Sequence, residues 1–149
     1  MRAQPITPEN FGPFGRVASP PSGPPLASDE TFKFWSDVAQ YDTDGESEIG
    51  FCTVYPRDGR VDWMERHDRT QELLVPIDGP FVLPVMDEDG GVHAFRAEPG
   101  TAVVIGRGVW HSACHPVDSD AATYFVIFRR GTPREDVVKQ EIEPFRVDI

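Results

Sequence analysis

The stretch between residues 49 and 129 most constrains the fold, because it is a succession of short runs in which apolar and polar residues alternate. Tight reversals separate the runs, and the segments 78–80 and 87–91 carry the Asp-Gly and Gly-Pro pairs typical of such turns. Strands are expected at residues 50–56, 62–67, 73–77, 81–86, 92–96, 101–105, 109–114 and 123–129. Short strands about ten residues apart without intervening helices predict an all-β antiparallel sandwich or barrel, with a jelly-roll barrel as the leading expectation.

The amino-terminal segment 5–15 is expected to form one helical turn. Thr7 stands in a capping position and Pro8 suits the first helical position. This turn would act as a plug that packs Phe11 and Phe14 on the core.

The remaining segments are expected to be short and peripheral. Residues 18–25 are rich in proline, serine and glycine, which predicts an irregular surface loop, and residues 32–35 alternate as a half-buried strand does. Thr132–Glu135 has the spacing of a capping box, which predicts a helix through about Gln140. With 149 residues, the chain is expected to form a single domain over residues 1–149.

Charge and composition exclude several classes of partner. The chain has 14 Lys and Arg against 25 Asp and Glu, a net charge of −11. Binding to nucleic acid or to an anionic membrane requires a basic surface, so neither is expected and a small-molecule partner fits better. No run approaches the ~18 apolar residues of a membrane span and the start lacks a secretion signal, which predicts a soluble, cytoplasmic protein. Cys52 and Cys114 lie far apart in apolar segments and are expected to be free thiols.

Four side chains of the metal-binding type occur near two of the predicted strands. Glu65 and His67 alternate with Met64 and Arg66, so the carboxylate and the imidazole would share one face of a strand. Glu72 begins the following strand and His111 belongs to a later one. Two carboxylates and two imidazoles suit Ni, Mn, Fe or Zn. The alternative interpretation is a hydrogen-bonded Glu-x-His pair and a core histidine with no metal.

The spacing of the first three of these residues resembles a known signature. Glu65-x-His67, four residues, Glu72, six residues and Gly79 is similar to the first signature of the cupins, with Glu65 in the place of the usual first histidine.

A second cupin-like signature follows at the expected separation. It consists of Gly100, five residues, Gly106-x-Gly108, two residues and His111, with His115 where asparagine is common. This resemblance implies a cupin barrel whose metal ligands are Glu65, His67, Glu72 and His111.

A more specific resemblance covers residues 5 to 140. The chain is similar to the ureidoglycolate lyases of allantoin catabolism, a part of purine metabolism, at residues 5–11, 13–15, 65–67, 71–79, 109–111 and 128–131. The resemblance implies a homodimeric cupin that splits ureidoglycolate into glyoxylate and urea with a divalent metal ion, nickel by preference.

The chain departs from that family at three places. Three residues separate His111 from His115, where the family often has adjacent histidines, and Ser36-Asp37-Val38 replaces a family His-Asp-Leu. Residues 54–57 replace an expected Asn-Arg pair. The substrate-binding side chains are therefore expected to differ.

Further side chains are candidates for catalysis and for substrate binding. Chelation of an α-hydroxy acid by the metal would require a base for the hydroxyl proton and an acid for the departing urea nitrogen. The candidates for these proton roles are His115, Tyr124 and Lys33, and the candidates for substrate binding are Arg107, Trp63 and Trp110. A packed or solvated structural role is the alternative for each.

Two other functions are compatible with the same residues. One is a different metallocupin lyase or isomerase that acts on a small hydroxy, keto or sugar acid. The other is a non-catalytic cupin that binds a small acid as a sensor, although no second regulatory domain is evident in the sequence.

Overall fold

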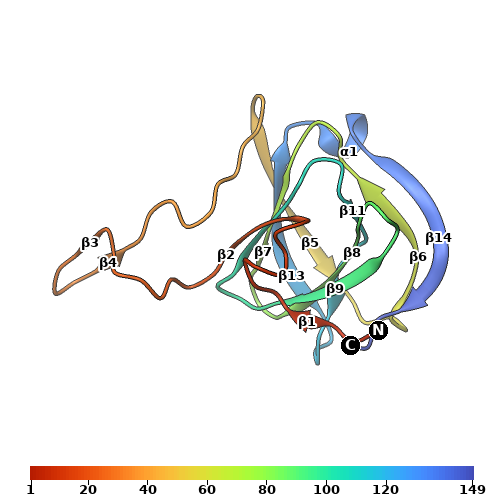
Figure 1. Cartoon of the computed structure of the whole chain (residues 1–149), viewed down its shortest axis with the longest axis horizontal. Coiled ribbons are helices and arrows are strands. Elements are labelled where there is room, and N and C mark those ends of the chain that lie inside the picture. Colours follow the sequence, from red (N-terminus) through yellow and green to blue (C-terminus); the bar gives the residue numbers. More distant parts are fainter.

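The computed structural model describes residues 1–149 and consists almost wholly of strands (Figure 1). The strands of a seven-stranded sheet lie in the order β1 (Gln4–Pro5), β9 (Val92–Ala97), β8 (Phe81–Met86), β11 (Trp110–His111), β6 (Arg60–Arg66) and β14 (Val138–Arg146), with β12 (His115–Pro116) paired to β8. Those of a five-stranded sheet lie in the order β2 (Gly15–Ala18), β10 (Ala102–Ile105), β7 (Glu72–Pro76), β13 (Ala122–Arg129) and β5 (Ser47–Val54). Neighbouring strands in both sheets are antiparallel except β1, which is parallel to β9. The predicted all-β barrel of the jelly-roll type is confirmed.

Most predicted strands are present with small shifts at their ends. Seven of them correspond to β5, β6, β7, β8, β9, β10 and β13. The run 109–114 is instead divided into β11 and β12, which pair with β8 at Val85 and Val82 respectively. Pro84 stands between these two positions and has no N–H to donate, although its carbonyl accepts from the Ser112 N–H at 3.0 Å. One continuous ladder along this part of β8 is therefore not formed.

The main core fills the space between the two sheets. Its buried side chains come from β2, β7, β8, β9, β10 and β13, from the segment before β2 and from Cys114. Phe11 and Phe14 are both buried there, and the Phe11 ring meets Phe95 edge-on at 5.2 Å between centroids, as predicted for the plug. Thr7 and Asn10 hydrogen-bond each other's backbone N–H, so the segment forms hydrogen-bonded turns and not a regular helix.

The carboxyl-terminal helix is much shorter than predicted. Helix α1 spans only Thr132–Glu135 and its N-cap is Gly131, in a left-handed conformation. The Thr132 hydroxyl does not cap the helix, because it donates instead to the Arg129 carbonyl at 2.6 Å. The capping-box interpretation is therefore wrong.

Strand β14 occupies the residues beyond α1, where helix was expected through Gln140. It pairs with β6, and Lys139 lies opposite Glu65 in this register. Asp136, between α1 and β14, accepts hydrogen bonds from the backbone N–H groups of Asp68 and Arg69 at 3.0 and 2.9 Å. These contacts hold the chain after α1 beside β6. Pairing with β6 stabilises this segment more than the few helix-favouring residues would stabilise a longer helix.

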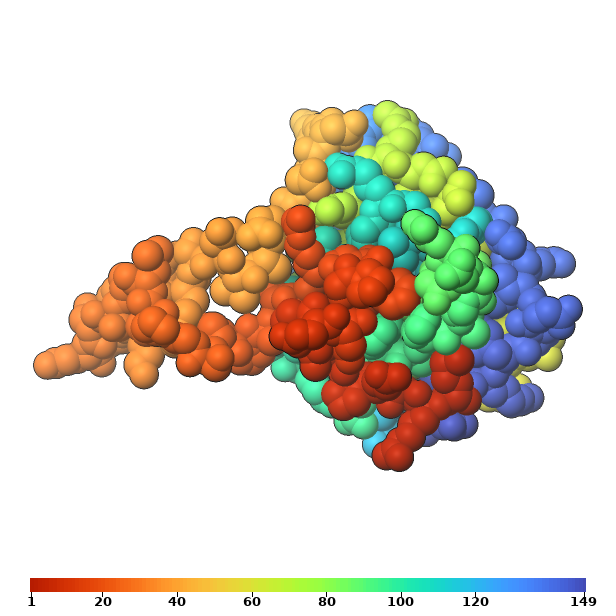
Figure 2. Space-filling model, viewed as in Figure 1, coloured from red at the N-terminus to blue at the C-terminus, as the bar shows by residue number.

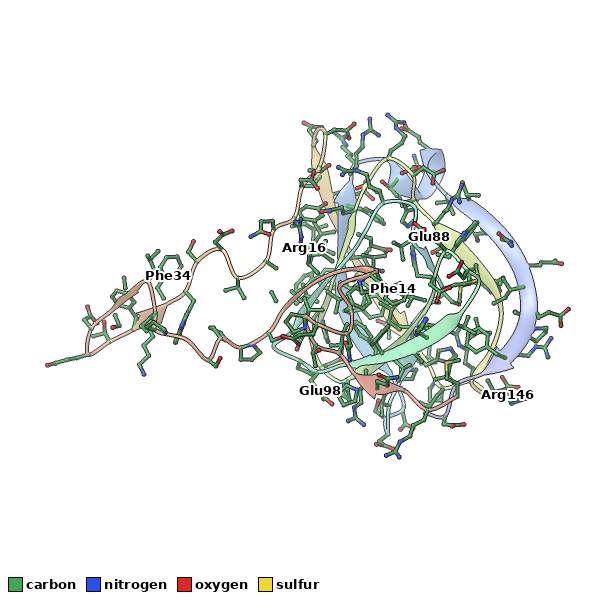
Figure 3. The ribbon with its side chains drawn as sticks, in the orientation of Figure 1. Phe14, Arg16, Phe34, Glu88, Glu98 and Arg146 are labelled. Atoms are coloured by element: carbon green, nitrogen blue, oxygen red, sulfur yellow. The ribbon has the colours of Figure 1, made fainter.

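Residues 19–46, which we call the arm, extend away from the barrel between β2 and β5 (Figures 1 and 2). The arm carries a separate two-stranded sheet of β3 (Ala27–Ser28) and β4 (Lys33–Phe34). Its beginning is irregular and exposed, as predicted for the proline-rich loop. The predicted half-buried strand at 32–35 is wrong in its burial, because Phe32 and Phe34 are about half exposed and Figure 3 places Phe34 far from Phe14 and the barrel.

The two cysteines are free, as predicted; Cys114 is buried and Cys52 is half-buried. None of the helical structure reaches the length and apolar character needed to cross a lipid bilayer.

Candidate metal centre

Three neighbouring elements bring the predicted ligands together at one end of the barrel. Glu65 lies near the end of β6 and His67 follows that strand directly, while Glu72 opens β7. His111, on β11, is the direct cross-strand partner of Glu65. Directly opposed residues of antiparallel strands have Cβ atoms only about 5 Å apart, so this register alone places the His111 imidazole beside the Glu65 carboxylate.

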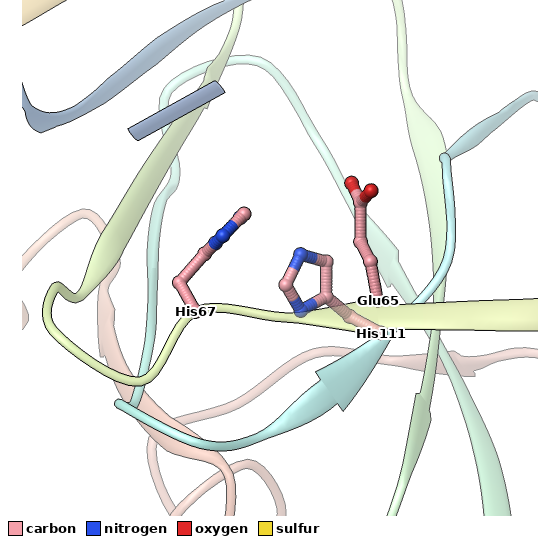
Figure 4. A group of neighbouring side chains, drawn as sticks. All are labelled: Glu65, His67 and His111. Carbon is pink, nitrogen blue, oxygen red and sulfur yellow. The ribbon is translucent and has the colours of Figure 1, made fainter. Parts of the chain in front are cut away.

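The liganding atoms of Glu65, His67 and His111 lie within 4.8 Å of one another. Figure 4 shows their side chains reaching from β6 and β11 toward a common space. The Glu72 carboxylate lies against both rings, with its Oε2 atom 2.8 Å from His111 Nε2 and 3.5 Å from His67 Nε2. The structure therefore brings Glu65, His67 and His111 together and places Glu72 against both histidines.

Both imidazoles are oriented by backbone carbonyl groups. The Nδ1 atom of His67 lies 2.6 Å from the Asp136 carbonyl oxygen, and that of His111 lies 3.0 Å from the Val109 carbonyl oxygen. With a proton on each Nδ1, the Nε2 atoms face the cluster as potential ligands, which is the arrangement found around metal-bound histidines. His111 Nε2 and Glu72 Oε2 are buried and, despite their 2.8 Å separation, have no hydrogen bond of acceptable angle. Two imidazoles, two carboxylates and these unpartnered atoms fit a divalent transition metal.

The charges of the cluster are strongly coupled. Burial disfavours the charged form of His67, but the adjacent Glu72 carboxylate outweighs it and raises the pKa of His67 to about 9. Burial likewise opposes the anion of Glu72, whereas the nearby charge of His111 lowers the pKa of Glu72 to about 2. The pKa of His111 is raised by Glu72 against the cost of burial. Without a metal, protons on the imidazoles compensate the buried carboxylate.

A cavity of about 660 Å³ opens beside the cluster. Glu65, His67 and Glu72 line it together with Arg134 from α1 and Lys139 from β14. The sequence interpretation missed both cationic residues, because the expected helix gave residues 132–140 no relation to β6. The pairing of β14 with β6 is the signal that identifies Lys139, and it is visible only in the folded chain.

The predicted substrate-binding residues lie around the cluster but in neighbouring hollows. Trp63 lines a hollow of about 710 Å³, where Lys139 Nζ lies 4.9 Å from the centroid of its ring. Lys139 thus borders both this hollow and the metal-side cavity. Trp110 and Arg107 line another hollow of about 1000 Å³, and the Arg107 guanidinium pairs there with Asp42 at 3.3 Å.

The three predicted proton-transfer residues are not among the residues that line the cavity. His115 is fully buried on β12, where the Arg57 Nε atom donates to its Nδ1 at 3.1 Å, and burial together with the Arg57 charge lowers its pKa to about 4. Tyr124 is packed in the main core against Phe81, and burial raises the pKa of its hydroxyl. Lys33 is exposed on the arm.

Several known proteins are similar to this chain. The chain is 31% identical to a ureidoglycolate lyase of Rhodobacter capsulatus over 88% of this chain and 87% of that protein. It is 27% identical to a ureidoglycolate lyase of Chelativorans sp. over 87% of this chain and 84% of that protein. Among solved structures, Bacillus subtilis oxalate decarboxylase matches 64% of this chain and 24% of its own length, with 18% identity and a TM-score of 0.48. A family model described as ureidoglycolate lyase matches residues 1–148. The chain therefore belongs to the ureidoglycolate lyase family.

Proposed function

We propose that this protein cleaves ureidoglycolate to glyoxylate and urea with the help of a divalent metal ion held by Glu65, His67, Glu72 and His111. The observation that carries the proposal is the convergence of the two Nε2 atoms and the carboxylates beside a cavity that also contains cationic side chains. Membership of the ureidoglycolate lyase family supports the choice of substrate.

Lys139 and Arg134 are the groups that bind the substrate carboxylate in this proposal. Both line the cavity, and the chain as a whole is acidic, so these two cations provide local attraction for an anion. A guanidinium can hold a carboxylate through two hydrogen bonds, and an ammonium adds a charge-assisted contact. The aromatic ring of Trp63 supports the Lys139 ammonium from the adjacent hollow.

The reaction requires the transfer of one proton within the site. A bound divalent ion would lower the pKa of the substrate hydroxyl and polarise its oxygen. We assign the proton transfer to Glu65, because its carboxylate lines the cavity beside the two imidazoles. Glu65 takes the hydroxyl proton as the carbonyl forms, the electrons of the carbon–nitrogen bond pass to the urea nitrogen, and Glu65 then protonates that nitrogen.

A direct assay tests this function. The purified protein, loaded with Ni²⁺ or Mn²⁺, is expected to release urea and glyoxylate from ureidoglycolate and to lose this activity after treatment with chelator. Full activity after complete removal of metal contradicts the metal role. A panel of other hydroxy, keto and sugar acids distinguishes the alternatives, since turnover of another acid favours a different metallocupin enzyme and metal binding without any turnover favours a sensor.

The coupled cluster predicts how the unfolding temperature of the metal-free protein, and its increase on metal binding, depend on pH. The raised pKa of His67 stabilises the folded metal-free protein below the unfolded value of about 6.5, and this contribution is lost as the pH rises through about 9. The lowered pKa of Glu72 contributes above about 4.5 and is lost as the pH falls toward about 2. The unfolding temperature of metal-free protein is therefore expected to fall from about pH 6 to about pH 8.5.

The increase in unfolding temperature caused by added metal should grow over the same range, because metal ions and protons compete for the imidazoles. Thermal unfolding of the wild type and of His67→Gln, with and without metal, measures both effects. The variant serves as the control for all other titrating groups. An identical pH dependence in the two metal-free proteins is incompatible with the coupling of His67 to Glu72.

A further inference from the structure

The cavity beside the metal centre is lined by one carboxylate besides those of the proposed metal ligands. It belongs to Glu135, the last residue of α1, whose side chain is 58% exposed. Glu65 and Glu72 line the same cavity, but both lie against the imidazoles of the cluster. Glu135 is therefore the carboxylate of the cavity that remains available to a bound molecule.

Two guanidinium groups hold the Glu135 carboxylate without using its capacity to accept hydrogen bonds. Its Oε2 atom lies 3.6 Å from Arg129 Nη1 and 4.0 Å from Arg69 Nη1. Both distances exceed the length of a hydrogen bond, so the attraction is electrostatic and the carboxylate keeps its lone pairs for other donors. The carboxylate lies directly over Gly131, where an added Cβ would be 3.2 Å from its Oε1 atom. The side chain is thus positioned but not consumed by its neighbours.

The segment from α1 into β14 forms one wall of the cavity and sets the order of its charges. Asp136, the neighbour of Glu135, offers its carbonyl oxygen to His67 Nδ1 at 2.6 Å. Three residues further along, Lys139 lies opposite Glu65 in the ladder of β14 with β6. Glu135 therefore borders the His67 side of the metal centre, and Lys139 borders the Glu65 side. An anion and a cation stand on the two sides of the ligand cluster.

A ureido group is well suited to recognition by a carboxylate. It carries N–H donors on both nitrogen atoms, and the two N–H bonds that point away from its carbonyl oxygen are nearly parallel. A carboxylate has two acceptor oxygen atoms at a matching separation and can accept both bonds, as it does from the N–H groups of a guanidinium. An amide with a methyl group in place of the terminal –NH₂ offers only one such donor. A carboxylate at this position therefore distinguishes the two groups.

We propose that Glu135 is a specificity-determining residue that binds the ureido group of the substrate, while Lys139 holds the substrate carboxylate on the other side of the metal ligands. This inference rests on the proposed function and narrows its substrates to α-hydroxy acids that carry a ureido group. The substrate carboxylate is attracted by Lys139 and repelled by Glu135, so the two charges select one orientation of the molecule. In that orientation the hydroxyl-bearing carbon, which joins the two ends, lies at the ligand cluster.

Two analogues that cannot be cleaved test the contact by binding alone. N-carbamoylglycine keeps the carboxylate and the ureido group of the substrate but lacks the hydroxyl, and N-acetylglycine has a methyl group in place of the terminal –NH₂. Calorimetry with the purified wild type is expected to show about tenfold tighter binding of N-carbamoylglycine, because it alone makes the second charge-assisted hydrogen bond. Glu135→Gln should lose this preference. Its affinity for N-acetylglycine should change by no more than about threefold, since the glutamine oxygen still accepts one N–H.

Glu98→Gln is the matched control for Glu135→Gln. The Glu98 side chain is 56% exposed and pairs with Arg96 at 2.7 Å, and it lies at the end of the barrel away from α1 (Figures 1 and 3). This variant should keep the full preference for N-carbamoylglycine.

Equal affinity of the wild type for the two analogues overturns the proposed contact, and so does a preference that survives in Glu135→Gln. An equal loss of affinity for both analogues in Glu135→Gln also contradicts it, because such a loss indicates general damage to the cavity. These measurements involve no turnover. An intact, Glu135-dependent preference together with a failed lyase assay would contradict the proposed function alone.

Discussion

The His111→Ala variant is expected to lose its bound metal and about a thousandfold of its ureidoglycolate-cleaving activity. His111 contributes a buried Nε2 atom with no hydrogen-bond partner, located 2.8 Å from the Glu72 carboxylate. Loss of a group that merely orients a ligand weakens metal binding 10–100-fold, and loss of the ligand itself should cost at least about a hundredfold. The metal contributes several kcal/mol to transition-state stabilisation, which corresponds to about a thousandfold in rate.

Metal content by mass spectrometry and the rate of urea release measure the two losses. His93→Ala is the matched control, because His93 pairs with Asp87 on the surface and does not contact the cluster. This variant should keep both metal and activity. Since His111 is buried, unfolding of the variant must be followed as well, and His67→Ala provides a second removal of one ligand. Retention of stoichiometric metal and full activity in folded His111→Ala contradicts the assigned ligand set.

The Lys139→Met variant is expected to show a KM for ureidoglycolate that is about 10- to 100-fold higher, with its metal content unchanged. A hydrogen bond to a charged group contributes about 1.5–3 kcal/mol, which accounts for this range. Methionine keeps most of the length of the side chain and removes only the charge and the donors. Lys139→Arg retains the charge and should recover most of the affinity.

The other lysine of the chain offers a matched control for Lys139. Lys33 is a sequence-predicted catalytic candidate that the structure places on the exposed arm, so Lys33→Met should leave KM and kcat unchanged if the cavity residues of one chain suffice. An unchanged KM for Lys139→Met rules out the carboxylate contact. A large loss for Lys33→Met assigns that lysine a role that its position within a single chain does not explain.

The clustering of the proposed metal ligands was predictable because it depends on strand alternation and motif spacing. Alternation along the chain places Glu65, near the end of β6, and His67, directly after it, on one face, and the cupin-like spacing adds Glu72 and His111. The strands themselves follow from local patterns of apolar and turn-forming residues. Their ends differ from the expected positions because ladder pairing, and not the residue pattern alone, determines where a strand stops.

The cationic side of the cavity was not predictable in the same way. Residues 132–135 carry a local helix signal, but the Asp136 contacts and the ladder with β6 end the helix and turn residues 138–146 into β14. Those contacts join residues about seventy positions apart, and no local pattern encodes them. The contact of buried His115 with Arg57 is likewise not encoded locally, because the two residues are 58 positions apart in the sequence.

The sequence by itself determined the all-β class and the plug of Phe11 and Phe14, and it pointed to the four candidate ligand residues, because each depends on periodicity, turn chemistry or motif spacing. Only the tertiary structure decided that Lys139 faces Glu65 and that the arm stands away from the barrel. It also decided that the outer face of the five-stranded sheet stays exposed. The physical reason is that strand pairing and burial are collective: a residue's partner across a ladder depends on the whole order of the strands, which short-range preferences do not specify.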